Sequence, residues 1–450
     1  MKRLIATIMV LGPTLVSAGA DVRIPAGAEN LSVDGTANCY IMKPGSTGYF
    51  DARFKGNSTV ETVGEIAGVK LVWQDSGELV SALDYDSDKG AIVATVAARS
   101  GNAVVAAVAA GGEILWSWHL WIVDYDPDND YTTEPNASGS TWTFMDRNLG
   151  ATTTERGVFG NYGMIYQWGR KDPFPGAADF TIMNDDYSYE NDGEPQLYAF
   201  DGSELPSIVS QAQYHGTIAL SIANPAVFYA MTYNHTGVLD EYGEEIVKND
   251  YPTGDWCDVS DDDYWGGESM KKTIYDPSPV GYKVPVCDAD GNTPYAWLTY
   301  ADMVWDSEHR GAEQNGQWFP ATGTRVYASG GIDHPDKNHY SGLWIGTKGK
   351  ASADLETYPD LYGQYMMIVN GKRTFKVSKD KRSQGMSLRC VRDESFVPGG
   401  VGNVAPGKNS VPAAVYSITG VKMLESVSDE AMRTLPPGIY VSQGHKIIVK

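Results

Sequence analysis

The chain has 450 residues, a formal net charge of -22 and an aromatic content of 11%. That length allows two to four domains. Tyr and Trp together far outnumber Phe, which is typical of β-rich folds and of binding surfaces. The acidic charge excludes a nucleic-acid partner, because phosphate binding requires a basic surface.

Residues 1–20 are typical of a secretory signal peptide. Lys2 and Arg3 form the charged start, Leu4–Val16 is apolar, and Ala18–Ala20 supplies small residues for cleavage. Beyond this segment no apolar run reaches the roughly 18 residues that a membrane-spanning helix needs. We therefore expect a secreted protein that does not span the membrane and is displayed at the outer-membrane cell surface.

Residues 21–130 are predicted to form a β-sandwich of immunoglobulin-like character. Short β-branched or alternating runs recur between clusters of Gly, Asp and Ser. These runs are Asn38–Met42, Lys70–Trp73, Ala91–Ala97, Ala103–Ala109 and Ile114–Val123. His119 lies in the last run with no second metal ligand near it, so we interpret it as a core histidine.

An acidic segment follows the predicted sandwich. Asp124, Asp126 and Asp128 stand at alternate positions, as in the first half of a calcium-binding EF-hand loop. Asn129 occupies the place of the required Gly, and Pro135 that of the bidentate Glu. A solvated linker is therefore favoured over a calcium site.

The central domain is expected over residues 131–395. Thr141–Phe174 is dense in Gly and aromatic residues, which predicts a loop-rich core. Asp185–Leu205 and Asp255–Gly267 are acidic loops that carry further aromatic rings. Such rings stack on sugar faces, while neighbouring carboxylates accept hydrogen bonds from hydroxyls; the alternative is that the rings pack the loops down. The candidate ligand contacts are Tyr187, Tyr189, Tyr198, Trp256, Tyr264 and Trp265.

Several motifs occur in a fixed order through this region. They are Trp142–Ala151, Gly163–Phe174, Val280–Pro285, a helix-like stretch with Trp297 and Trp305, Trp318–Arg325, Gly342–Ile345 and Gly385–Asp393. Over residues 140–393 this set resembles the Fibrobacter succinogenes major paralogous domain, a module of exported Bacteroidota proteins. The resemblance implies an α+β domain with the C-type-lectin-like fold that formylglycine-generating enzymes share. In that fold the chain ends meet in a small antiparallel sheet, with one or two helices alongside and long loops on one face.

Four cysteines are present, namely Cys39, Cys257, Cys287 and Cys390, and no CxxC pair occurs among them. Export favours disulfides, and the sequence alone leaves three pairings open. The resembling family commonly has a Cys where Ser278 stands, paired with the one at position 390. Because that partner is missing, the resemblance favours a Cys287–Cys390 bridge. Cys257 as partner, or free buried thiols, are the alternatives.

The chain ends in a Gly/Pro-rich linker, 396–410, and a predicted small β-sandwich, 411–450. Val415–Gly420, Leu435–Val441 and Lys446–Lys450 resemble the C-terminal sorting domain of the type IX secretion system. The resemblance implies the secretion machinery as a partner of this tail. The alternative is a β domain that merely ends the chain.

The sequence carries no HExxH helix, GxSxG elbow or phosphate-binding loop, so we expect no enzyme and no cofactor. The best hypothesis is an adhesion or binding protein of the cell surface that recognises a glycan or a surface protein. The alternatives are an extracellular polysaccharide-active enzyme and a purely structural, fimbria-associated protein.

Overall fold

The computed structural model describes residues 23–178, 193–211, 216–230, 235–239, 245–247, 254–299, 301–333, 340–349, 362–369, 376–398, 415–417, 422–424, 435–436, 438–442 and 445–449. The expected signal peptide, Tyr187, Tyr189 and most of the expected linker lie outside these residues. The chain divides into a large compact unit that ends at Glu394 and a small one that comprises Ser395–Lys450 together with Val33–Gly35.

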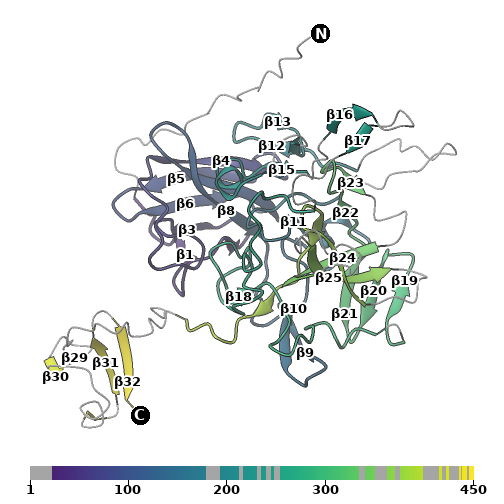
Figure 1. Cartoon of the computed structure of the whole chain (residues 1–450). Helices are drawn as coiled ribbons and strands as arrows, with labels where there is room; N and C mark the ends of the chain where they lie inside the picture. The colour runs from purple at the N-terminus through teal and green to yellow at the C-terminus, as the bar shows by residue number, and fades with distance from the viewer. Residues whose placement is uncertain are drawn as a thin grey trace. The chain divides into compact units, whose positions relative to one another are not determined.

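Regular structure in the described residues is almost entirely β-sheet, which confirms a β-rich protein (Figure 1). The helices are α1 (Ile218–Ala223), capped by the Thr217 hydroxyl, and a single 3-10 turn, η1 (Phe159–Asn161). The prediction of a helix around Trp297 and Trp305 was wrong, because Trp305 lies in a β-strand and Trp297 in a turn. No helix of the described segments is long and apolar enough to cross a membrane.

The N-terminal region is a β-sandwich, which confirms that part of the prediction. Phe50 and Ile92 of one sheet share a core with Val105, Trp116 and Trp118 of the other. The first sheet contains, in order, β1 (Glu29–Asn30), β3 (Thr47–Asp51), β6 (Ala91–Val96) and β5 (Val80–Asp86). The second contains β13 (Glu204–Leu205), β12 (Leu197–Tyr198), β4 (Gly68–Gln74), β7 (Gly101–Val108), β8 (Ile114–Ile122) and β2 (Cys39–Met42).

Strand β8 is buried on both of its faces. Trp116 and Trp118 point into the sandwich, whereas Trp121 belongs to a second core that the central region completes. The Trp121 indole donates a hydrogen bond of 3.0 Å to the carbonyl of Ala151. His119, on the same face as Trp121, is buried, which confirms its interpretation as a core residue.

The second sheet of the sandwich includes strands from the central region. Tyr198 of β12 pairs with Gln74 of β4, and the Gln74 side chain donates to the carbonyl of Ala199 at 3.1 Å. The boundary expected at residue 130 therefore does not separate two compact units. The two regions share one sheet and one core.

The ends of the central region meet in a small antiparallel sheet, where Phe144 pairs with Val391. This sheet contains, in order, β18 (Tyr282–Lys283), β28 (Val391–Arg392), β10 (Thr141–Met145) and β9 (Tyr131–Pro135). The chain between β10 and β28 also forms a seven-stranded sheet. Its strands are, in order, β23 (Ile332–Asp333), β22 (Thr324–Arg325), β27 (Gly385–Ser387), β24 (Tyr340–Lys348), β25 (Tyr362–Val369) and β26 (Lys376–Lys381), with β11 (Ile165–Gln167) paired with β27.

Smaller sheets complete the central region. One has three strands, β19 (Val304–Asp306), β20 (Gly311–Gln314) and β21 (Gln317–Pro320). Two pairs are formed by β14 (Val209–Gln211) with β15 (Val227–Tyr229) and by β16 (His235–Leu239) with β17 (Glu245–Val247).

The segment Thr141–Phe174 forms the loop-rich core that its composition predicts. Tyr166 and Trp168 are fully buried there, and the Trp344 indole donates to the carbonyl of Tyr166 at 2.8 Å. The side-chain oxygen of Asn148 accepts from the Arg389 guanidinium at 3.0 Å. These side-chain contacts add to the pairing of β10 with β28 and of β11 with β27, and together they tie the segment to distant parts of the chain.

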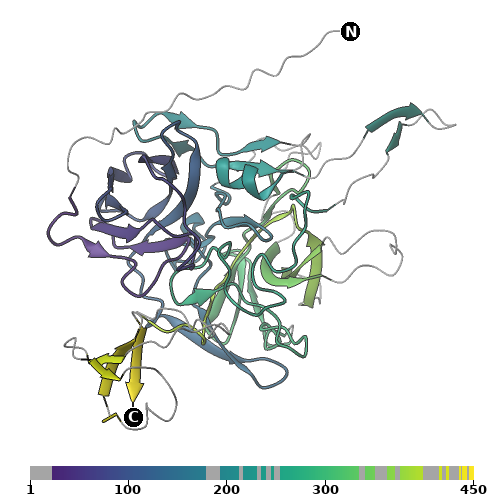
Figure 2. The same cartoon turned by 60° about the vertical axis from the view of Figure 1, so that its left-hand side comes forward.

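The small C-terminal unit is a single antiparallel sheet in the residues described, rather than the expected two-layered sandwich. Figure 2 shows its yellow strands side by side. They are, in order, β30 (Lys422–Leu424), β29 (Val415–Ser417), β31 (Gly438–Ser442) and β32 (His445–Val449).

A buried polar network joins the sandwich to the central region. The Asp75 carboxylate accepts from the backbone and the side chain of Asn102, at 2.7 and 3.0 Å. The Asn102 amide also donates to the carbonyl of Gly150 at 3.1 Å, and its oxygen accepts from His119 Nε2 at 2.9 Å. Burial raises the pKa of Asp75 to about 6 and lowers that of His119 to about 3.

Asp75→Asn is expected to remove a pH-dependent loss of stability. The folded protein binds the Asp75 proton more tightly than the unfolded chain, so this group destabilises the fold as pH rises from about 4 to 6. At pH 7 the variant gains on the order of 2 kcal/mol in its free energy of unfolding. Urea unfolding of both proteins across this pH range measures the difference. Asp88→Asn, in an exposed turn, is the control, and equal pH profiles for wild type and Asp75→Asn would contradict the assignment.

Candidate functional site

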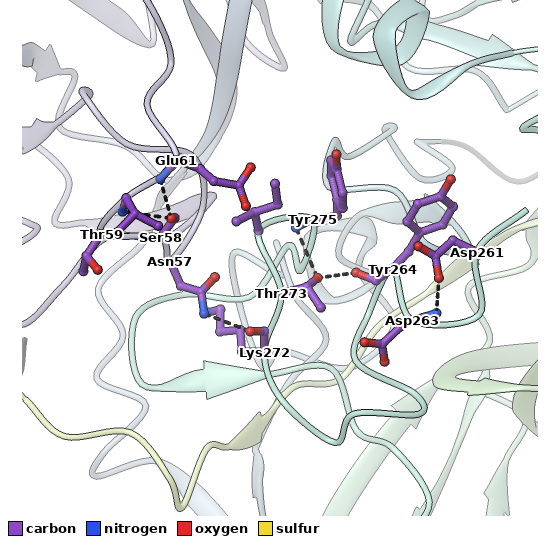
Figure 3. Close-up of a pocket in the computed structure, with 12 residues that line it drawn as sticks. Asn57, Ser58, Thr59, Glu61, Asp261, Asp263, Tyr264, Lys272, Thr273 and Tyr275 are labelled. Atoms are coloured by element: carbon purple, nitrogen blue, oxygen red, sulfur yellow. Dashed lines mark hydrogen bonds between the residues drawn. The ribbon is translucent and has the colours of Figure 1, made fainter. Parts of the chain in front are cut away.

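A cavity of about 560 Å³ opens where the N-terminal sandwich meets the second acidic loop (Figure 3). A hairpin turn of the sandwich lines one side and residues 261–275 line the other. The lining residues are Asn57, Ser58, Thr59, Val60, Glu61, Asp261, Asp263, Tyr264, Lys272, Thr273, Ile274 and Tyr275. This volume lies within the range of small-ligand sites.

The hairpin turn is held by its own hydrogen bonds and by the opposite wall. The amide of Lys55 donates to the carbonyl of Glu61 at 2.9 Å, and the Ser58 hydroxyl accepts from the Glu61 amide at 2.8 Å. Across the cavity, the Asn57 side chain donates to the carbonyl of Lys272 at 2.9 Å (Figure 3). The Glu61 carboxylate is thereby carried to the rim on a fixed turn.

Two aspartates of the acidic loop line the opposite wall and have different roles. Asp263 Oδ1 accepts from the amides of Glu268 and Ser269, at 3.0 and 2.8 Å, so this carboxylate shapes the loop. Asp261 accepts one bond through Oδ1, from the amide of Asp263 at 2.8 Å, and its side chain is exposed. Asp261 is therefore the more exposed of the two carboxylates of this wall.

Two tyrosines form the aromatic part of the wall, with ring centroids 5.6 Å apart in an edge-to-face arrangement. Tyr264 is buried, and its hydroxyl donates to the carbonyl of Val259 at 2.8 Å. Tyr275 is half-buried. Burial, followed by the negative charges of Glu61 and Asp261, raises the pKa of Tyr275, so its hydroxyl stays protonated beside both carboxylates.

The lysine of the cavity wall is engaged by backbone. Lys272 Nζ donates to the carbonyls of Ser278, Pro279 and Tyr282, at 2.9, 2.7 and 2.7 Å. Burial lowers the pKa of this ammonium. With the lysine held by these carbonyls, the groups at the rim that can meet a ligand are carboxylates and hydroxyls.

Two of the predicted contact residues are core residues instead. Trp256 and Trp265 are each only 1% exposed. The Trp256 indole donates to the carbonyl of Trp168 at 2.7 Å, and the Trp265 ring packs against Trp168 with centroids 5.7 Å apart. The prediction that they face a ligand was wrong, because an irregular loop without a sheet of its own needs large rings to fill its interior.

Of the remaining predicted tyrosines, the structure brings Tyr264 to the cavity wall. Tyr198 lies in β12, paired with β4 of the sandwich, and is not among the residues that line the cavity. Tyr187 and Tyr189 lie outside the described residues.

The sequence did not indicate the hairpin side of the cavity. Asn57–Glu61 is a short, mostly polar segment between strands, and such composition is typical of any surface turn. Tyr275 precedes the motif Val280–Pro285 without being part of it. The hairpin turn and Tyr275 come together only because two segments far apart in the chain are in contact. The periodicity of the sequence carries no information about such a contact.

The aspartates of the predicted linker are used within it and for a contact to the central region. Asp126 accepts from the amide of Asp128 at 3.0 Å and from the Asn129 side chain at 2.6 Å. Asp128 accepts from the Tyr282 hydroxyl at 2.9 Å. Asp124 is exposed. In the described part of the chain, no three His, Cys, Asp or Glu side chains gather as a metal-binding group.

The expected disulfide between Cys287 and Cys390 is not formed, and the four cysteines are buried thiols. Cys287 Sγ lies 3.5 Å from the Gln364 side-chain oxygen, and its amide donates to the Thr347 hydroxyl. Cys390 belongs to a different hydrophobic cluster, which it shares with Cys39. The strand Tyr282–Lys283 does pair with Val391–Arg392, next to Cys390, but Cys287 lies further along the chain and packs in another cluster.

Comparison with protein-family models, with curated proteins and with solved structures found no match. The resemblance in the ordered motifs therefore remains an argument from residues alone.

Gly56→Ala is expected to force the two cavity walls apart. Gly56 has φ +49°, and a Cβ there would lie 2.4 Å from the carbonyl oxygen of Ile274. Gly112→Ala is the matched control, because Gly112 also has positive φ, at +88°, but a Cβ there meets nothing within 4 Å. Gly56→Ala should cost about 1–3 kcal/mol more in the free energy of unfolding than the control. Urea unfolding measures both, and equal costs would show that the walls are not in tight contact.

Proposed function

We propose that the chain is an exported binding protein of the cell surface and that the cavity between its hairpin turn and its acidic loop recognises a glycan. One observation carries the proposal: carboxylates and a half-buried tyrosine from two distant segments line a single open cavity. Carboxylates accept hydrogen bonds from sugar hydroxyls, and an aromatic ring offers an apolar face to a pyranose.

The arrangement of the wall favours binding over catalysis. Ser58 accepts from the amide of Glu61, and Lys272 donates to three carbonyls, so both act as structural groups. The Glu61 and Asp261 side chains are exposed at the rim, where they remain hydrated. Exposed carboxylates on a rigid wall suit a reversible, wet interface with a polyhydroxyl ligand.

The motif resemblance supports the same assignment for the whole chain. The resemblance supports a C-type-lectin-like recognition domain of the Fibrobacter succinogenes major paralogous type for the central region. The spacing of the strands before it supports an immunoglobulin-like spacer. The tail would act as a type IX sorting domain that delivers the protein to the outer-membrane surface. The acidic net charge and the segment at the start of the chain that is typical of a signal peptide agree with this localisation.

Glu61→Gln and Asp261→Asn are each expected to weaken glycan binding about tenfold, which corresponds to losing one charge-assisted hydrogen bond of about 1.4 kcal/mol. A glycan array with the full chain identifies the ligand, and calorimetric titration then measures the variants. Glu65→Gln and Asp258→Asn are matched controls, because both carboxylates are exposed on the same segments but do not line the cavity.

Repeating the glycan array in the presence of a chelator shows whether calcium contributes to the same binding. Saturable binding that Glu65→Gln retains and Glu61→Gln loses would support the site. Binding that all four variants retain would move the glycan site elsewhere. An array without any binding would contradict the glycan proposal and favour a protein ligand or a structural surface role.

A further inference from the structure

The cavity between the hairpin turn and the acidic loop has a negatively charged wall. Its lining includes the carboxylates of Glu61, Asp261 and Asp263, and Lys272 is the only cation among the described residues that line it. Lys272 Nζ donates to three backbone carbonyls, which uses all the hydrogens that an ammonium group carries. A ligand at the rim therefore meets carboxylates and no ammonium donor with a hydrogen to spare.

The cations near the acidic loop are bound to aspartates that do not line the cavity. The Arg382 guanidinium lies 3.4 Å from the Asp255 carboxylate and also bonds to Asp262. Lys348 Nζ donates to the second oxygen of Asp262 at 2.8 Å. Among the described residues, no cation forms an ion pair with the three carboxylates that line the cavity. The unpaired negative charge of this region is thus at the cavity wall.

The aromatic ring of the same wall is held from outside the cavity. The side chain of Asn38 donates to the carbonyls on either side of Tyr275, those of Ile274 at 2.7 Å and Asp276 at 2.9 Å. Asn38 is 1% exposed, and its side-chain oxygen accepts from the Trp116 indole at 2.9 Å. The Trp116 and Tyr275 rings are also in contact, with centroids 6.1 Å apart. The half-buried ring of Tyr275 therefore has a fixed position before any ligand binds.

Two of the carboxylates act on this ring. In the view of Figure 3, Tyr275 lies between Glu61 and Asp261, and all three line the cavity. Burial, followed by the charges of Glu61 and Asp261, raises the pKa of Tyr275, which agrees with this placement. A cation is attracted both to carboxylates and to the face of an aromatic ring. One wall of the cavity thus combines the two kinds of group that bind an ammonium ion.

We propose that the glycan site selects amino sugars that carry a free ammonium group, as opposed to N-acetylated, neutral or anionic sugars. This inference rests on the proposed function and names the class of sugar. A sugar hydroxyl and an ammonium group can both donate to Glu61 and Asp261, but the bond between two charged groups is the stronger. Anionic sugars are disfavoured, because their carboxylates would meet carboxylates of the wall.

Calorimetric titration of the full chain tests this selectivity with tetrasaccharides of glucosamine, N-acetylglucosamine and glucose. All three have the same linkage and differ in the group at C2. The glucosamine tetrasaccharide should bind at one site and at least about tenfold more tightly than the other two. Glu61→Gln and Asp261→Asn should each remove most of this preference.

Glu65→Gln and Asp258→Asn are the matched controls and should retain the preference. They make the same change in charge on the same segments, but neither residue lines the cavity. They therefore separate the site from the general attraction of a cation to a chain with a net charge of -22. Tyr275→Leu should also weaken the preference, whereas Tyr275→Phe, which keeps the ring, should retain it. If Tyr275→Leu fails to fold, the carboxylate variants alone decide.

Equal affinities for the three tetrasaccharides, or a preference that Glu61→Gln and Asp261→Asn leave unchanged, would overturn the inference. Equally tight binding of tetralysine with the same dependence on both carboxylates would also overturn it, because the site would then recognise a basic protein. Each of these results leaves glycan binding by the array as a separate finding. An array without any binding contradicts the proposed function itself, so the two failures are distinguishable.

Discussion

The architecture depends on the burial of both faces of β8. A strand of an antiparallel sandwich ordinarily turns one face to water, but here the central region covers that face. The polar side chains on it must then find partners inside the protein. The Ser117 hydroxyl donates to Asp172 at 2.6 Å, Lys171 donates to Asp172 at 2.6 Å, and His119 bonds to Asn102. These bonds specify a single way for the two regions to join.

The cavity is a consequence of that junction. The hairpin turn before β4 reaches the acidic loop because the sandwich and the central region share a sheet and a core. Gly56 permits backbone to approach backbone at Ile274, and Asn57 closes the contact at Lys272. The carboxylates of Glu61 and Asp261 are thus placed on one rim by the packing of whole regions rather than by a local motif.

Aromatic side chains hold the central region of this protein together, a role that packed helices have in many other proteins. With one short helix in its described residues, the central region connects irregular segments through indole hydrogen bonds to distant carbonyls. The Trp168 indole donates to Ile345 at 2.9 Å and the Trp256 indole donates to Trp168 at 2.7 Å. A large ring with one polar atom fills space and satisfies backbone together, which explains why rings that resemble binding residues in the sequence lie in the core.

The sequence by itself determined the local properties: the β-rich character, the sandwich near the start of the chain, the loop-rich core of Thr141–Phe174 and the core role of His119. These follow from side-chain periodicity and composition, which act over a few residues. Tertiary structure alone decided that the first two regions form one compact unit, that Trp256 and Trp265 are buried, and that Cys287 and Cys390 belong to different hydrophobic clusters. Such outcomes depend on which distant surfaces exclude water from each other, and no local pattern in the chain encodes that choice.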